Sequence, residues 1–121
     1  MALIKRFEDI QAWQEARVLV QMTYGLTNKE QFSKDYGLKD QIRRASVSSM
    51  ANIAEGFDCE SKIEFARFLG IARRSAVEVQ SLLFVARDVD YISQDEFASL
   101  YEQARKTKAL IGGFKSSLGK K

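Results

Sequence analysis

One stretch of this chain repeats apolar residues with the spacing that a helix in a bundle requires. From residue 65 to residue 86, small or apolar side chains recur at alternating steps of four and three. This spacing keeps one stripe of a helix apolar along its length, so the helix packs nearly parallel or antiparallel to its neighbours. The positions are Phe65, Leu69, Ala72, Ala76, Val79, Leu83 and Ala86. The chain is therefore expected to build its core from long, aligned helices.

Three other segments carry a comparable apolar stripe and complete a set of four helices. We expect helices over residues of about 9–27, 38–55, 61–88 and 93–118, and no segment shows the two-residue alternation of a strand. Two of the helices open with a capping box, in which a serine accepts a backbone N–H and a glutamate three residues later reaches back to the serine N–H. The boxes run from Ser61 to Glu64 and from Ser93 to Glu96.

The segments between these helices contain polar residues and glycines. Residues 28–36 lose the apolar pattern and are predicted to form a loop, with Phe32 and Tyr36 available to anchor it on the bundle. Gly56 is expected to stop the second helix, because glycine adopts the left-handed conformation of a C-terminal cap without strain. The pair Gly112-Gly113 weakens the fourth helix, which is expected to fray there or shortly after.

The predicted fold class is all-α: a single domain over residues 1–121, folded as an antiparallel up-down-up-down four-helix bundle. No apolar run reaches the roughly 20 residues of a membrane span, so no membrane partner is expected. Residues 1–6 are too few, and too soon followed by acidic Glu8 and Asp9, for a secretion signal. The single cysteine, Cys59, cannot form an internal disulfide, which favours a cytoplasmic protein.

Composition argues against catalysis and metal chemistry. The chain has no histidine, which removes the commonest general base and the commonest metal ligand. The serines Ser46, Ser48 and Ser49 follow arginines rather than a base that could activate a nucleophile. We therefore expect no enzyme activity, no cofactor and no metal site. An enzyme that depends on Glu55 is the weakest hypothesis.

A polar group on the second predicted helix is unusual for a bundle. Arg44, Ser48, Asn52 and Glu55 share one helix face, and Glu78 lies at a compatible position on the third helix. One interpretation makes these residues a ligand or catalytic cluster. The favoured interpretation is a structural polar network of Arg44, Asn52, Glu55 and Glu78, satisfied within the bundle or between subunits. Arg–carboxylate pairs are geometrically specific and common at interfaces.

Basic residues supply another candidate site. The net charge is +3, and the segment from residue 103 to the end contains six Lys or Arg and no acidic residue. Such density can bind phosphates with release of counterions, although cations near a helix C-terminus also form an ordinary solvated face. The candidate nucleic-acid-binding residues are Arg43, Arg73, Arg74, Arg105, Lys106 and Lys108.

The third predicted helix carries a second apolar stripe besides its seam. The stripe consists of Phe68, Ile71, Leu82, Val85 and Val89. A monomeric bundle needs one inward stripe per helix, so the surplus indicates either a thick core or a subunit interface. We favour an interface, and therefore a homo-oligomer.

The chain resembles a known bacterial family from Phe7 to about Leu118. The specific part is residues 41–56, with Gln-Ile-Arg-Arg-Ala at 41–45 and Asn-Ile-Ala-Glu-Gly at 52–56. Looser matches are Phe7, Trp13, Tyr36-Gly37-Leu38, Glu64-Phe65, Phe68-Leu69, Ile71-Ala72, Ser75 and Glu78. These motifs resemble the four-helix-bundle proteins encoded by intervening sequences of bacterial 23S ribosomal RNA genes. Those proteins are related to the accessory protein of diversity-generating retroelements.

The resemblance implies a small cytoplasmic bundle that assembles into ring-like homopentamers. For the retroelement relative it implies a basic surface that contacts nucleic acid and a reverse transcriptase. Two positions depart from the family pattern: residues 28–35 lack the usual proline, and Arg74 stands where a glycine is usual. A charged residue at that position can change a close helix contact or add to a basic patch.

These observations favour a non-enzymatic, oligomeric helical-bundle protein that binds nucleic acid through its phosphates. Structured RNA or an RNA–protein complex is the expected ligand. The alternative is a structural or protein-interaction module with no nucleic-acid role, in which the surplus apolar stripe builds the ring and a groove for a partner.

Overall fold

The computed structural model describes residues 4–119, which form helices and short connections. The elements are a 3-10 turn η1 (Phe7–Asp9) and the α-helices α1 (Gln11–Thr27), α2 (Glu30–Lys34), α3 (Tyr36–Phe57), α4 (Lys62–Asp88) and α5 (Gln94–Leu118). There is no strand among the described residues. The expected all-α class is confirmed.

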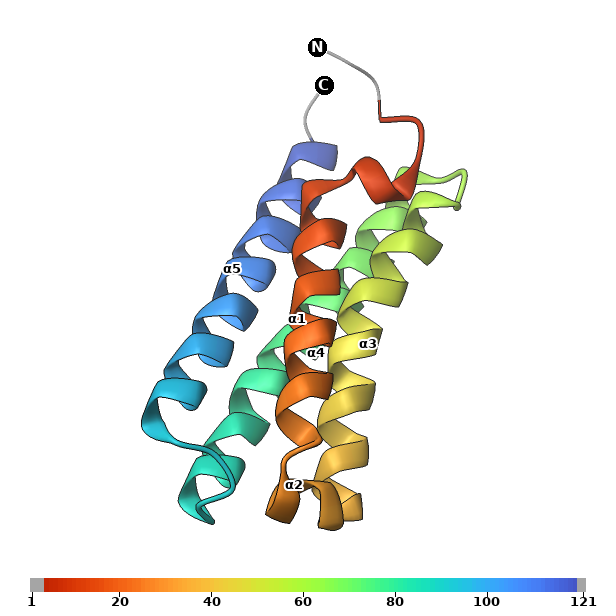
Figure 1. Ribbon diagram of the computed structural model, residues 1–121. Helices are drawn as coiled ribbons and strands as arrows, with labels where there is room; N and C mark the ends of the chain where they lie inside the picture. The colour runs from red at the N-terminus through yellow and green to blue at the C-terminus, as the bar shows by residue number, and fades with distance from the viewer. Residues whose placement is uncertain (1–3, 120–121) are drawn as a thin grey trace.

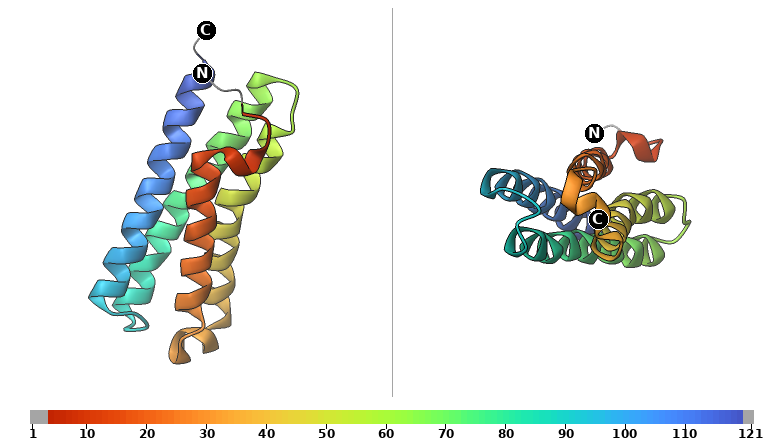
Figure 2. Two further views of the ribbon diagram at one scale, coloured as in Figure 1. Left: turned by 45° about the horizontal axis from the view of Figure 1, so that its top comes forward. Right: turned by 60° about the horizontal axis from the view of Figure 1, so that its bottom comes forward.

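The four long helices lie side by side as an antiparallel bundle (Figure 1). Helix α1 packs on α3 and α5, and α4 packs on the same two helices from the opposite side. Figure 2 shows η1 and the α3–α4 connection at one end of the bundle, with α2 and the α4–α5 connection at the other. This arrangement is the up-down-up-down order that the sequence predicts.

Serines cap α4 and α5 at the expected positions. Ser93 forms the full capping box, because its hydroxyl accepts from the Glu96 N–H at 3.1 Å and the Glu96 carboxylate accepts from the Ser93 N–H at 2.8 Å. Only half of the box forms at Ser61, whose hydroxyl accepts from the Glu64 N–H at 3.2 Å. The Glu64 carboxylate turns instead to Arg67, which donates to it at 3.0 Å.

The loop expected over residues 28–36 contains a short helix, α2. Its Phe32 side chain is fully buried, and the ring centroid lies 5.4 Å from that of Tyr91, near the start of α5. This burial holds α2 against the end of the bundle. Tyr36 begins α3 and stays 69% exposed. Phe32 is therefore the residue that anchors the segment, and Tyr36 is not.

Gly56 has a different role from the one expected. It lies inside the last turn of α3, which continues to Phe57, and no glycine in residues 4–119 has a positive φ. The expectation of a left-handed helix stop is therefore wrong. A Cβ on Gly56 would lie 2.8 Å from the Cβ of Phe68 and 2.8 Å from the Cδ1 of Phe65. Gly56 is needed because α4 approaches α3 closely here.

The second half of α5 is continuous. The helix passes through Gly112 and Gly113 without a break and ends at Leu118. Its last turns rest on the bundle through Phe114, whose ring centroid lies 5.5 Å from that of Phe65. Tertiary packing of this kind offsets the cost of glycine in a helix.

The core fills the bundle in two clusters of buried side chains. The cluster towards α2 contains Leu19, Phe32, Ile42 and Leu83, and the cluster towards η1 contains Trp13, Ile53, Leu69 and Ile111, among others. Every position of the apolar seam between residues 65 and 86 is buried. The seam was therefore read correctly from the sequence.

The second apolar stripe of α4 is only partly absorbed into the bundle. Phe68, Ile71 and Leu82 are half-buried against neighbouring helices. Val85 and Val89 keep 44% and 49% of their surface exposed.

None of the helices within residues 4–119 is both long and apolar enough to cross a membrane.

Candidate nucleic-acid interface

Arg43, the first candidate cation, is held inside the protomer. Its Nε donates to the Thr27 hydroxyl at 2.8 Å and its Nη2 donates to the Asn28 side chain at 3.0 Å. Its guanidinium also lies 4.2 Å from the centre of the Tyr24 ring. These contacts tie α3 to the C-terminal end of α1, so the fold already uses much of the binding capacity of Arg43.

Arg105 and Lys106 are each paired with a carboxylate. Arg105 donates to Glu102 through Nε at 2.9 Å and Nη2 at 2.7 Å, which raises the pKa of Arg105 and lowers the pKa of Glu102. Lys106 lies 3.4 Å from Glu15 on α1. Hydrogen bonding to Gln103, followed by the effect of Lys106, lowers the pKa of Glu15. Both cations therefore have a local counter-charge, although such exposed pairs are weak.

The other three candidates, Arg73, Arg74 and Lys108, form no ion pair within the described residues, and neither does Lys115. Arg73 and Arg74 belong to α4, and Lys108 and Lys115 to α5. We call these four residues the cationic strip. It runs along the outer side of the contact between α4 and α5.

Two glycines show how the strip is built. A Cβ on Gly112 of α5 would lie 3.4 Å from the Nε of Arg73 on α4. A Cβ on Gly70 of α4 would lie 3.7 Å from the Nη1 of Arg74 and 4.0 Å from the Nζ of Lys115 on α5. The cationic side chains therefore lie against glycines. Because glycine has no side chain, the cations rest directly on the helix backbones.

Lys108 extends the strip along α5. It precedes Gly112 by four residues, so it lies one turn earlier on the same helix face. It is half-buried. Two turns separate it from Lys115, which is about 10 Å along the helix axis.

No carboxylate opposes these charges on the same part of the two helices. Residues 65–77 of α4 and 103–118 of α5 contain no Asp or Glu. Glu64, just before the first segment, pairs with Arg67. Glu78, just after it, accepts from Gln41 on α3 at 3.2 Å, on the other side of α4. The strip is thus a local concentration of positive charge, which attracts anions.

Sequence reasoning selected Arg73, Arg74 and Lys108 but not Lys115. A usable signal was present, because Lys108, Gly112 and Lys115 follow the same steps of four and three as the seam. The sequence did not reveal that this face of α5 meets the acid-free part of α4.

The predicted polar network is divided into separate pieces in this protomer. Asn52 donates to the Ser48 hydroxyl at 2.9 Å, and the hydroxyls of Ser48 and Ser75 lie 2.8 Å apart, which links α3 to α4. Glu78 bonds to Gln41 instead of joining this chain of hydrogen bonds. The structure brings Asn52 together with the two serines and leaves Glu78 apart from them.

Arg44 and Glu55, the remaining members of that predicted network, are exposed on α3. No salt bridge within residues 4–119 includes either side chain. The pairing expected for them is therefore absent from the part of the protomer that the structure describes. Pairing between subunits stays a prediction.

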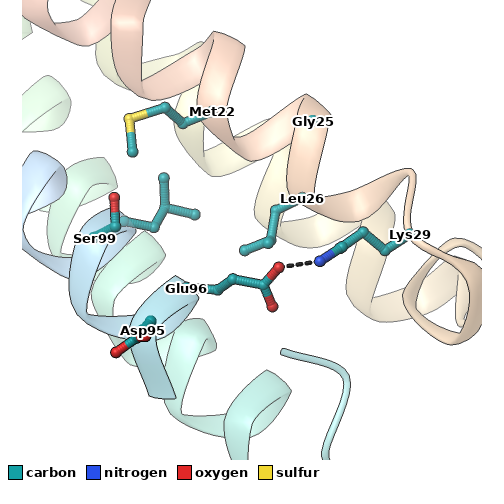
Figure 3. A pocket seen from close by; sticks show the side chains of 8 residues that line it. Met22, Gly25, Leu26, Lys29, Asp95, Glu96 and Ser99 are labelled. Carbon is teal, nitrogen blue, oxygen red and sulfur yellow. Dashed lines mark hydrogen bonds and ion pairs between the residues drawn. The ribbon is translucent and has the colours of Figure 1, made fainter. Parts of the chain in front are cut away.

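An apolar groove lies elsewhere, between the C-terminal half of α1 and the start of α5 (Figure 3). It has a volume of about 440 Å³ and is lined by Met22, Gly25, Leu26 and Leu100, among others. Lys29 and Glu96 form an ion pair at its edge, and the hydrogen bond from Lys29 lowers the pKa of Glu96. Figure 3 shows the Leu26 side chain directed toward α5. The groove has an apolar floor. At its edge Lys29 and Glu96 neutralise each other, and Asp95 also lines the groove.

Comparison with solved structures supports the fold. The chain is similar to a crystal structure from Bacteroides thetaiotaomicron VPI-5482, described as a protein with unknown function from the S23 ribosomal protein family. The TM-score is 0.79 at 21% sequence identity, and the match covers 87% of this chain and 95% of the other. At this identity the likeness concerns the fold alone.

Comparison by sequence gives the family. No match is found among curated proteins. The profile of the 23S rRNA-intervening sequence proteins matches residues 8–113, which is most of the chain and includes the motif at residues 41–56. This protein therefore belongs to the family of 23S rRNA-intervening sequence proteins.

Proposed function

We propose that this protein is a non-enzymatic helical-bundle protein that binds nucleic acid, with RNA as the first expected ligand, through its phosphates. The observation that carries the proposal is the cationic strip: Arg73, Arg74, Lys108 and Lys115 have no ion-pair partner in the described residues. The family name refers to intervening sequences of 23S rRNA, which adds support for RNA. A cytoplasmic location is part of the proposal, and the single cysteine is consistent with it.

Binding at the strip follows from ordinary electrostatics. Phosphates that approach Arg or Lys release condensed counterions, so the affinity falls linearly on a log–log plot against salt concentration. At Gly70 and Gly112 the cations rest directly on the helices, with no glycine side chain that would hold them apart. The strip contacts phosphates only, so it predicts little preference for base sequence.

The role of the cationic strip in binding can be tested with two double variants that each remove two positive charges. Arg73→Gln/Arg74→Gln removes two unpaired cations, and Arg105→Gln/Lys106→Gln removes two paired ones. We expect the first variant to weaken RNA binding and to lower the salt slope by roughly 1.5, because each lost phosphate contact contributes about 0.7–0.9. The second variant is expected to change the slope much less. The measurement is fluorescence anisotropy with mixed RNA at several salt concentrations.

Two results would count against the proposal. One is the absence of RNA binding by the unaltered protein at low salt. The other is equal weakening by the two double variants, because net charge alone would then explain the affinity.

The proposal includes assembly into a homo-oligomeric ring, a pentamer if the family resemblance extends that far. Two observations support assembly: Val85 and Val89 are exposed on one side of α4, and Arg44 and Glu55 form no ion pair with any other residue in 4–119. Exposed apolar area of this kind is typical of interfaces. A ring would repeat the cationic strip once in each subunit.

Light scattering tests assembly directly. We expect a mass that is a multiple of 13.8 kDa for the unaltered protein, and a smaller mass for Val85→Glu, which would place a charge in the interface. Gln21→Glu, exposed on α1 on the opposite side of the bundle from α4, is the matched control and should keep the full mass. A 13.8 kDa particle at high concentration would exclude the ring.

A second candidate function is a protein-interaction module with no nucleic-acid role. The observation that favours it is the apolar groove of Figure 3, which lies on the α1–α5 side of the bundle and does not include the cationic strip. For such a module, neutralising Lys108 and Lys115 should leave partner recovery in pull-down experiments unchanged.

A further inference from the structure

Three aromatic rings cluster where α4 and α5 meet near their connection. The ring centroid of Phe84 lies 4.9 Å from that of Phe97 and 5.8 Å from that of Tyr101. Phe97 is almost fully buried and forms the base of the cluster, whereas Phe84 keeps 42% of its surface exposed. The Arg87 guanidinium lies 5.1 Å from the Phe84 ring centre. An aromatic surface with an adjacent cation therefore faces outward.

This aromatic surface continues the line of the cationic strip. Phe84 follows Arg73 by eleven residues, or about three helical turns, so the two side chains leave α4 on nearly the same face. Val77, which lies between them, is also exposed. Tyr101 precedes Lys108 on α5 by seven residues, or about two turns. The cations and the aromatic rings thus line one side of the bundle, separated along the helix axes by about 16 Å on α4 and about 10 Å on α5.

We propose that the cationic strip and the aromatic surface of Phe84 and Tyr101 form one site for single-stranded nucleic acid. The phosphates lie at the strip, and an unpaired base stacks on Phe84. This inference rests on the proposed function and narrows its ligand from RNA in general to an unpaired segment. About five stacked nucleotides, at roughly 3.4 Å each, span the distance between the two parts.

The aromatic rings would let the site distinguish single-stranded from duplex nucleic acid. Bases in a duplex are stacked on one another, so their faces are closed to a protein side chain. An unpaired base offers its face to an aromatic ring, and such stacking tolerates any base because every base has a π face. The Arg87 guanidinium, which lies over the Phe84 and Phe97 rings, adds a cation close to the stacked base. The cations alone would bind both forms of nucleic acid.

The experiment compares three probes of about 12 nucleotides, within the range of single-strand site sizes. They are a single-stranded RNA of mixed sequence, an abasic strand with the same number of phosphates, and a duplex of the same sequence. We expect the unaltered protein to bind the single strand at least roughly 5- to 150-fold more tightly than the abasic strand, because the abasic strand cannot stack on Phe84. Phe84→Leu, which keeps apolar volume and removes the π face, should weaken single-strand binding roughly 5- to 150-fold. It should not change binding of the abasic strand.

Tyr36→Leu is the matched control, because it removes an exposed aromatic ring that lies on α3. It should leave the affinity for all three probes unchanged. Arg73→Gln/Arg74→Gln should weaken binding of all three, because each probe carries phosphates. Thermal melts and light scattering on each variant report folding and assembly.

The outcomes separate this inference from the proposed function. Absence of binding to every probe at low salt overturns both. Similar affinity for the three probes, with Phe84→Leu unchanged, leaves phosphate binding in place and overturns the single-strand site. A Phe84→Leu variant that weakens binding of the abasic strand equally, or that loses subunits, assigns Phe84 to folding or assembly and also overturns the single-strand site.

Discussion

Replacing Phe32 with alanine is expected to lower the free energy of unfolding by about 3–5 kcal/mol, the usual cost of removing a fully buried phenylalanine. Phe32 is the only aromatic residue of α2, has no exposed surface and packs against the Tyr91 ring. Its loss would leave a cavity at the end of the bundle and remove the contact that holds α2. The measurement is equilibrium unfolding in urea.

Tyr36→Ala is the control for this prediction. The residue lies only four positions away, but its side chain is 69% exposed and contacts the Lys39 ammonium at the surface. Its replacement should cost at most about 1 kcal/mol. Equal small effects of both substitutions would mean that α2 is not part of the cooperative core.

Replacing Gly56 with alanine is expected to destabilise the protein by roughly 2 kcal/mol. The added methyl would lie 2.8 Å from the Cβ of Phe68, an atom fixed to the α4 backbone, so relief requires the two helices to separate. Overpacking of this kind costs about 1–3 kcal/mol, and the better helix propensity of alanine recovers only part of it. The midpoint of urea unfolding should fall.

Gly113→Ala is the same chemical change, but we expect it to change the stability in the opposite direction. Gly113 lies in the interior of α5, and a Cβ there would meet nothing within 4 Å. The substitution should stabilise the protein by up to about 1 kcal/mol. If Gly56→Ala also stabilised the protein, the close approach of α3 and α4 at Gly56 would be excluded.

The main helices are predictable because their signals are local. The seam from Phe65 to Ala86 repeats within one helix, and the serines at the starts of α4 and α5 lie beside the groups that they cap. The anchoring of α2, by contrast, depends on a long-range contact. Phe32 is buried against Tyr91, which is far along the chain, so the local sequence contains the aromatic residue but not the contact that it makes.

The candidate site shows the same difference between local and long-range contacts. Arg105 could have been set aside from the sequence, because Glu102 stands three residues before it on the same helix face. The pairing of Lys106 with Glu15 joins α5 to α1, and no local pattern contains it. The sequence therefore supplied a list of cations, and only the packing of the helices showed which of them keep their charge available.

The hydroxyl contact between Ser48 and Ser75 has a consequence for the whole bundle. The hydrophobic effect itself has no direction, but a donor and an acceptor must meet at one height. A displacement of α3 along α4 by one turn, about 5.4 Å, would separate the two hydroxyls. This small polar contact therefore helps to set the axial alignment of the two helices, together with the close approach at Gly56. It also fixes the level at which Gly56 meets Phe68, and the level at which the neighbouring Arg74 is presented to solvent.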